Sequence, residues 1–147
     1  MNYNDDILYN KNYLLIVPTI SKEYFKYLKY SFKNVILFDS TKDLDNIIKF
    51  VDKNNFKQLI FVDYMPEYLE IIKSVKKKCI YRILYTNSLG GFSNKFNYSN
   101  FKSVIDLYNT NKINSIGFID KNLYEILKNK NIKSFHISLD VSKKRLC

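Results

Sequence analysis

The sequence predicts an α/β fold, a three-layer Rossmann-like sandwich in which helices cover both faces of a six-stranded, mostly parallel sheet. Three observations predict it. Six short apolar runs alternate with five amphipathic segments along the chain. Most of the runs are continuously apolar, which is typical of strands buried on both faces of a parallel sheet. The segments between them are long enough to be the crossover helices that parallel neighbours need.

The predicted strands are the apolar runs. In chain order they are Tyr13–Val17, Asn34–Phe38, Gln58–Val62, Cys79–Tyr85, Ser115–Ile119 and Ser134–Leu139. The first run is too short for a signal sequence or a membrane span, so we expect a cytoplasmic protein.

The predicted helices are the amphipathic segments. In chain order they are Ser21–Phe32, Thr41–Asn54, Met65–Lys77, Ser99–Asn109 and Asn122–Lys130. Three of their starts carry sequence signals. Ser40 or Thr41 is placed to cap the second helix, and Pro66 suits the first turn of the third. The last helix opens with Asn122-Leu-Tyr-Glu, which has the pattern of a capping box.

The length of 147 residues predicts one domain with a substantial core. We expect this Rossmann-like domain to span residues 13–141, with an N-terminal extension over 1–12 and the start of a linker or tail over 142–147.

The formal charge of +10 raises the question of an anionic partner. Only Arg82 and Arg145 supply guanidinium groups, however, and the other basic residues are lysines. Because base readers and phosphate clamps favour arginine, we expect no specific nucleic-acid partner. The runs Lys76–Lys78 and Lys143–Arg145 are predicted to be a solvated helix end and a tail, with at most a weak association with a membrane surface.

The sequence lacks the residue patterns of common metal-binding and nucleotide-binding sites. The two cysteines, Cys79 and Cys147, make no disulfide framework, and the single histidine, His136, cannot build a histidine metal site. Cys79 is predicted to be a small buried side chain. The stretch Pro18–Ser21 after the first strand has no glycine, so neither a dinucleotide fingerprint nor a P-loop is present. We therefore expect no metal and no cofactor.

Asp63 ends the stretch QLIFVD and is followed closely by Met65-Pro66. Bacterial receiver domains carry their phosphate-accepting aspartate in a similar setting. Phosphoryl transfer there needs Mg²⁺ held by an acidic pair after the first strand, and this chain has Pro18 and Thr19 at that place. The sequence therefore favours a polar strand end over a phosphorylation site.

Ligands of open parallel sheets bind outside the carboxyl ends of the strands. The polar residues and glycines at those ends are the candidate binding residues, and no catalytic residue is identified among them. They are Thr19, Ser21, Asp63, Tyr64, Thr86, Asn87, Ser88, Gly90, Gly91, Asp120 and Lys121. The loop Ser88–Gly91 could hold a sugar hydroxyl or a phosphate with backbone N–H groups, or it could be an ordinary wide turn. The opposite edge is expected to carry only helix C-termini and lysines, without a pocket.

The final stretch, INSIGFIDKNLYEILKNKNIKSFHISLDV (Ile113–Val141), resembles the last β-α-β unit in the N-terminal half of GT-B-type nucleotide-sugar-dependent glycosyltransferases. The stretch RILYTNSLGGFSN (Arg82–Asn94) resembles the acceptor-side loop of that half. The chain departs from many retaining members, which have a glycine-rich loop after the first strand and a histidine after the fourth. It has Thr19–Ser21 and Asn87–Ser88 there.

The resemblance implies an acceptor-side domain that would bind a sugar or glycan acceptor at the candidate binding residues. It further implies that the domain is inactive by itself, because its partner, the C-terminal nucleotide-sugar-binding domain, is missing from this chain. The alternative is a non-catalytic flavodoxin-like or receiver-like domain for signalling or protein interaction. A paired sixth strand over Ser134–Leu139 would favour the transferase. A cationic nucleic-acid binder would instead show a basic patch with exposed aromatic rings on one face.

Overall fold

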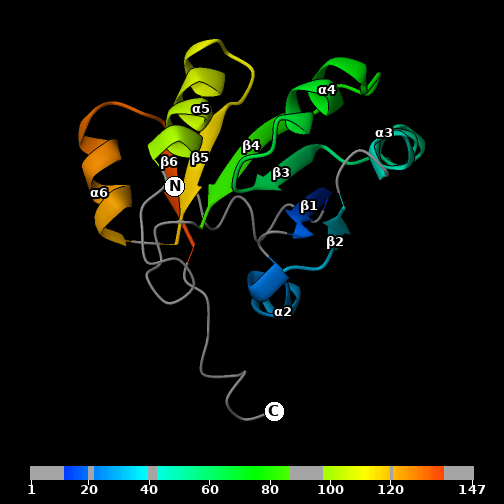
Figure 1. Cartoon of the computed structure of the whole chain (residues 1–147), viewed down its shortest axis with the longest axis horizontal. Coiled ribbons are helices and arrows are strands. Elements are labelled where there is room, and N and C mark those ends of the chain that lie inside the picture. Colours follow the sequence, from blue (N-terminus) through cyan, green and yellow to red (C-terminus); the bar gives the residue numbers. More distant parts are fainter. Residues whose placement is uncertain (1–11, 20–21, 40–42, 87–97, 120, 138–147) are drawn as a thin grey trace.

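The computed structural model describes residues 12–19, 22–39, 43–86, 98–119 and 121–137. Its centre is one six-stranded sheet with the order β2-β1-β3-β4-β5-β6 (Figure 1). Every neighbouring pair is parallel, so the predicted fold class is confirmed and the sheet is parallel throughout. The strands are β1 (Tyr13–Pro18), β2 (Val35–Phe38), β3 (Gln58–Val62), β4 (Ile80–Tyr85), β5 (Ser115–Phe118) and β6 (Ser134–His136).

Helices cover both faces of the sheet (Figure 1). They are α2 (Lys22–Ser31), α3 (Leu44–Lys53), α4 (Glu67–Ser74), α5 (Tyr98–Asn109) and α6 (Lys121–Asn129). The chain steps from β1 outward to β2 and then passes back over β1 to reach β3. Because such crossovers are right-handed, this reversal places α2 on one face and α3 to α6 on the other. Figure 1 shows α2 below the sheet and the other four helices on its opposite side.

Alternation along the strands divides the core between the two faces. On β1, Leu14 and Ile16 pack in the cluster that includes Val51 of α3 and Tyr68 of α4. Their neighbours Tyr13, Leu15 and Val17 pack in a second cluster with Leu28 of α2. Burial of the strands on both sides is the reason that their sequences are continuously apolar rather than alternating.

Two predicted helix ends are wrong. Helix α6 begins at Lys121, so Asn122 lies inside the helix and is not the cap of a capping box. Helix α4 ends at Ser74, three residues before the predicted end at Lys77. The backbone N–H groups of Lys76 and Lys77 donate instead to Asp52 Oδ1, at 2.8 and 3.1 Å. This carboxylate holds the chain in an extended connection, and the lysine run is therefore a loop and not a helix end.

The C-terminal part of the sheet agrees with the predicted sixth strand. Strand β6 pairs in parallel with β5, with Gly117 opposite Phe135. Cys79 lies just before β4 and is only partly buried, with its Sγ 3.3 Å from Phe56 O. The predicted caps Ser40 and Thr41, the extension before Asn12 and the tail from residue 138 lie outside the described residues. Within the described ranges, no helix is long and apolar enough to span a membrane.

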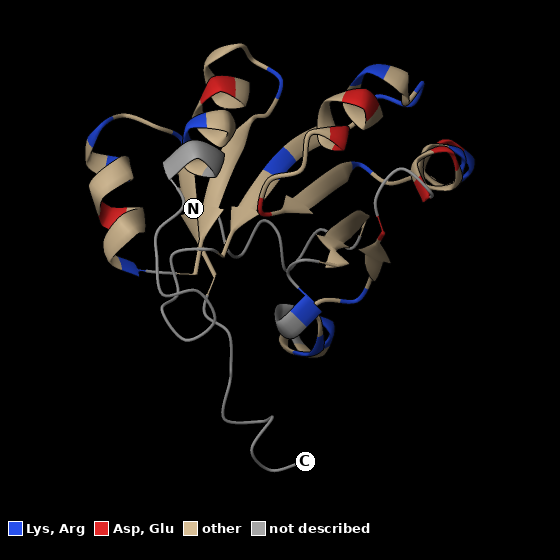
Figure 2. Ribbon diagram, in the orientation of Figure 1, with Lys and Arg blue, Asp and Glu red and all other residues tan. Residues whose placement is uncertain are grey.

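Basic residues are spread over the helices and connections (Figure 2). Helices α3 to α6 carry both signs of charge, whereas the described charges of α2 are lysines. Lys22, Lys26 and Lys29 are exposed, and their spacing places them along one side of α2. Tyr30 beside them is 59% exposed. One side of helix α2 therefore carries three exposed lysines.

Candidate functional site

The expected ligand position lies between β1 and β3, because the order in which the chain adds strands to the sheet reverses there. Open α/β sheets bind their ligands at such a switch point, outside the carboxyl ends of the strands. The register of Ile16 with Phe61 brings Pro18 level with Asp63, two residues further along each strand. Thr19 and Tyr64 come next at this edge, and α2 and α4 leave it on opposite faces of the sheet. The described candidate site is therefore the end of β1, β3 and β4.

Asp63 is held inward at this edge. It is 1% exposed and its backbone has φ +57°, a left-handed conformation that aspartate tolerates better than most residues. Its backbone N–H donates to Leu84 O at 2.8 Å. The Thr86 N–H donates to Asp63 Oδ1, and the Thr86 hydroxyl donates to Oδ2. One carboxylate thus accepts two hydrogen bonds from the residue that follows β4.

This Asp63–Thr86 link ties the end of β3 to the end of β4. Thr86 is itself 0% exposed, so neither side chain reaches the surface in this conformation. Both were predicted to contact a ligand directly. In this structure the two side chains are buried and bonded to each other, and the bonds hold the backbone at the end of β3, where Tyr64 follows.

Two tyrosines, Tyr68 and Tyr85, lie close enough to Asp63 for its charge to affect their pKa values. The Tyr68 hydroxyl donates to Val62 O at 2.6 Å, and the Tyr68 ring stacks on Phe61 with centroids 4.4 Å apart. Burial, together with the charges of Asp63 and Glu67, raises the pKa of Tyr68 well above its ordinary value. Burial and Asp63 raise the pKa of Tyr85 to about 12. Both phenols therefore stay protonated at neutral pH and are not candidates for a general base.

The other predicted residues lie in separate places. Thr19 is exposed, Tyr64 is half-buried, and Lys121 is exposed at the start of α6. Strands β3 and β4 lie between β1 and β5, so about 14 Å separates Thr19 from the β5 end. One sugar ring cannot contact both. The predicted residues Ser21, Asn87, Ser88, Gly90, Gly91 and Asp120 lie outside the described residues.

Glu67 was not predicted and belongs to this edge. It opens α4, and its spacing of four residues from buried Ile71 places it on the sheet-facing side of the helix. Its Oε2 atom is buried and has no hydrogen-bond partner within the described part of the protein. An acceptor in this state suits a ligand that brings a donor group, such as a hydroxyl. The sequence signal was available, because Glu67 follows Pro66 directly after a buried strand.

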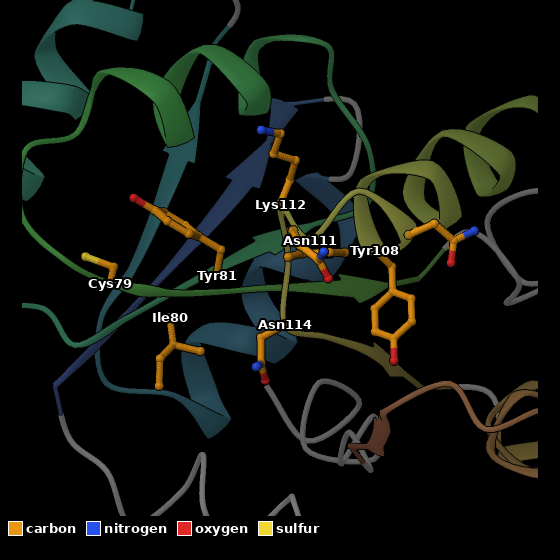
Figure 3. Close-up of a pocket in the computed structure, with 9 residues that line it drawn as sticks. Cys79, Ile80, Tyr81, Tyr108, Asn111, Lys112 and Asn114 are labelled. Atoms are coloured by element: carbon orange, nitrogen blue, oxygen red, sulfur yellow. The ribbon is translucent and has the colours of Figure 1, made fainter.

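A pocket of about 570 Å³ lies at the opposite, N-terminal edge of the sheet (Figure 3). It is lined by the start of β4, including Ile80 and Tyr81, and by the connection from α5 to β5. The prediction that this edge forms no pocket is therefore wrong. The connection between α5 and β5 bends over Asn111, which has φ +62°, and leaves a hollow beside β4.

No group of three histidine, cysteine, aspartate or glutamate side chains able to hold a metal ion occurs among the described residues. Comparison of the chain with family models, curated proteins and solved structures finds no match. Any function assigned to the chain therefore rests on its geometry and on the chemistry of its residues.

Proposed function

We propose that this chain is the acceptor-side domain of a GT-B-type glycosyltransferase, which moves a sugar from a nucleotide-sugar donor to an acceptor. In this proposal a separate C-terminal nucleotide-sugar-binding domain is the partner, and the domain has no activity by itself. The acceptor, a sugar or a glycan, binds at the carboxyl ends of β1, β3 and β4.

The paired sixth strand carries the proposal. The β5-α6-β6 unit covers the described part of the stretch that resembles the transferases, and β6 lies parallel to β5 as a further member of the sheet. A five-stranded receiver-like or flavodoxin-like sheet has no strand at this place. The β1–β3 switch point supports the same interpretation, since Thr19, Tyr64 and Glu67 offer a hydroxyl, a phenol and an unpartnered carboxylate oxygen there.

The alternative is a non-catalytic flavodoxin-like or receiver-like domain, and the strand order favours it. The order β2-β1-β3-β4-β5 is that of flavodoxin-like folds, whereas the dinucleotide-binding order has two strands outside the first. The position of Asp63 speaks against a receiver, because a phosphoryl donor has no access to a carboxylate that is 1% exposed. The basic side of α2 would supply any weak contact with an anionic membrane surface in either case.

A binding and turnover experiment tests the transferase proposal. We expect N-acetylglucosamine or glucose, added to nitrogen-15-labelled protein, to shift the backbone amide signals of Thr19, Tyr64 and Glu67. Incubation with UDP-glucose, UDP-N-acetylglucosamine or GDP-mannose should give neither transfer nor hydrolysis. Turnover that rises in proportion to the 147-residue protein would contradict the proposed division between two domains. If neither sugar shifts these three amide signals, the proposed acceptor site is contradicted.

A phosphorylation experiment tests the alternative. We expect acetyl phosphate and Mg²⁺ to leave the mass of the protein unchanged, because both oxygens of Asp63 are engaged by Thr86. The comparison protein is Asp63→Asn. A gain of one phosphoryl group that is absent from Asp63→Asn would show that Asp63 is a phospho-acceptor and would favour the receiver-like alternative.

A further inference from the structure

The pocket at the N-terminal edge has the size of a ligand site. Its volume of about 570 Å³ falls within the range of small-molecule pockets, roughly 300–1,000 Å³. Figure 3 shows side chains from two separate parts of the chain around it, with Ile80 and Tyr81 from β4 and Asn111 and Asn114 from the α5–β5 connection. It lies at the other end of the strands from the proposed acceptor site.

The wall of the pocket is fixed by backbone hydrogen bonds. After α5 the Lys112 N–H donates to Leu107 O at 2.9 Å, and the Asn111 N–H donates to Tyr108 O at 3.1 Å. These bonds close the helix end around the left-handed Asn111. The Asn114 N–H then donates to Tyr81 O at 2.7 Å and joins the connection to β4. A pocket built in this way is formed before any ligand arrives.

The side chains of the pocket match hydroxyl groups. The amides of Asn109, Asn111 and Asn114 each offer donors and an acceptor, as sugar hydroxyls do, and they make no hydrogen bond to the described protein. Ile80 is 44% exposed and supplies an apolar surface beside them. Lys112 is the one charged residue among those that line the pocket, and no carboxylate faces it there. Lys112 would repel a cationic ligand, and one lysine is too little positive charge to bind a multiply charged anion.

We propose that this pocket is a second ligand site, separate from the proposed acceptor site, which binds a saccharide that is neutral or carries one carboxylate. The ring hydroxyls bond to the amides of Asn111 and Asn114. The side chain of Lys112 points away from Ile80 and Asn114 in Figure 3, so it favours a carboxylate through its positive charge and not by direct pairing. The apolar face of the ring packs on Ile80.

Titration of labelled protein tests this site with three probes that differ in charge: N-acetylglucosamine, glucuronic acid and glucosamine. We expect the first two to shift the amide signals of Asn111, Lys112 and Asn114, and the cationic glucosamine to bind more weakly than glucuronic acid. Asn111→Gly should weaken binding about tenfold, because it removes one amide worth about 1–1.5 kcal/mol in hydrogen bonding. Glycine adopts the left-handed conformation freely, so the variant keeps the turn.

The matched control is Asn131→Gly. Asn131 has φ +63° and ends α6 in the same way, with its N–H donating to Lys128 O, but it does not line the pocket. This variant should bind as the wild type does. The proposal is overturned if no probe shifts the pocket signals, or if Asn111→Gly binds as tightly as Asn131→Gly. Shifts confined to Thr19, Tyr64 and Glu67 would overturn this second site while supporting the proposed function.

Discussion

Replacing Asp63 with alanine is expected to lower the free energy of unfolding by about 2–5 kcal/mol. Two effects add. Alanine at φ +57° carries a left-handed backbone strain of roughly 1–2 kcal/mol. Loss of the carboxylate also leaves the buried Thr86 N–H without its acceptor, at a cost of about 1–3 kcal/mol. Urea denaturation followed by circular dichroism measures the change, and an unchanged slope would show that the unfolded state is not affected.

Two further variants separate these effects. Asn111→Ala has nearly the same backbone angle, φ +62°, at an exposed position, so its loss of stability reports the strain alone. Asp63→Asn tolerates the left-handed backbone and keeps one oxygen for the Thr86 N–H, so it should lose less than Asp63→Ala. If Asp63→Ala loses no more stability than Asn111→Ala, the Asp63–Thr86 link contributes nothing to the fold.

Replacing Gly117 with alanine is expected to destabilise the protein by about 1–3 kcal/mol, through crowding of the β5–β6 pair. A Cβ atom at Gly117 would lie 2.1 Å from Cε2 and 2.2 Å from Cζ of Phe135. Phe135 is 0% exposed, and the guanidinium of Arg82 lies over its ring at 5.9 Å, so the ring has little room to move. Chemical denaturation measures the loss, and hydrogen exchange should show it concentrated in β6.

The second-site variant Phe135→Leu tests the cause. A smaller side chain opens space for the new methyl group, so Gly117→Ala should cost less in the Phe135→Leu background than in the wild type. The coupling free energy between two contacting residues is typically about 0.5–3 kcal/mol. Additive losses in the double variant would mean that the contact between Gly117 and Phe135 does not limit the packing.

The sequence predicted at which edge of the sheet the polar residues of the candidate site lie, but not the direction in which their side chains face. Polar residues after apolar runs identified the edge where Thr19, Asp63 and Tyr64 lie, because parallel strands end together. Whether such a residue faces a ligand or the interior depends on a backbone angle and on a partner from another strand. Asp63 turns inward because Thr86, the residue that follows the neighbouring strand β4, donates a hydrogen bond to each of its carboxylate oxygens. The residues next to Asp63 and Thr86 in the sequence do not indicate that these two side chains bond to each other.

The amino-acid sequence by itself determined the six strands and five helices, because continuous apolar runs and helical stripes are local patterns that burial requires. Only the tertiary structure decided the strand order, the pocket beside β4 and the contact of Gly117 with Phe135. It also decided the role of Arg82, which lies within an apolar run. Its Nε donates to Gln58 Oε1 and its terminal nitrogen to Ser115 Oγ, both at 2.7 Å, on the two strands that flank β4. These features join residues that are far apart in the chain, and their energies exist only once the strands have paired.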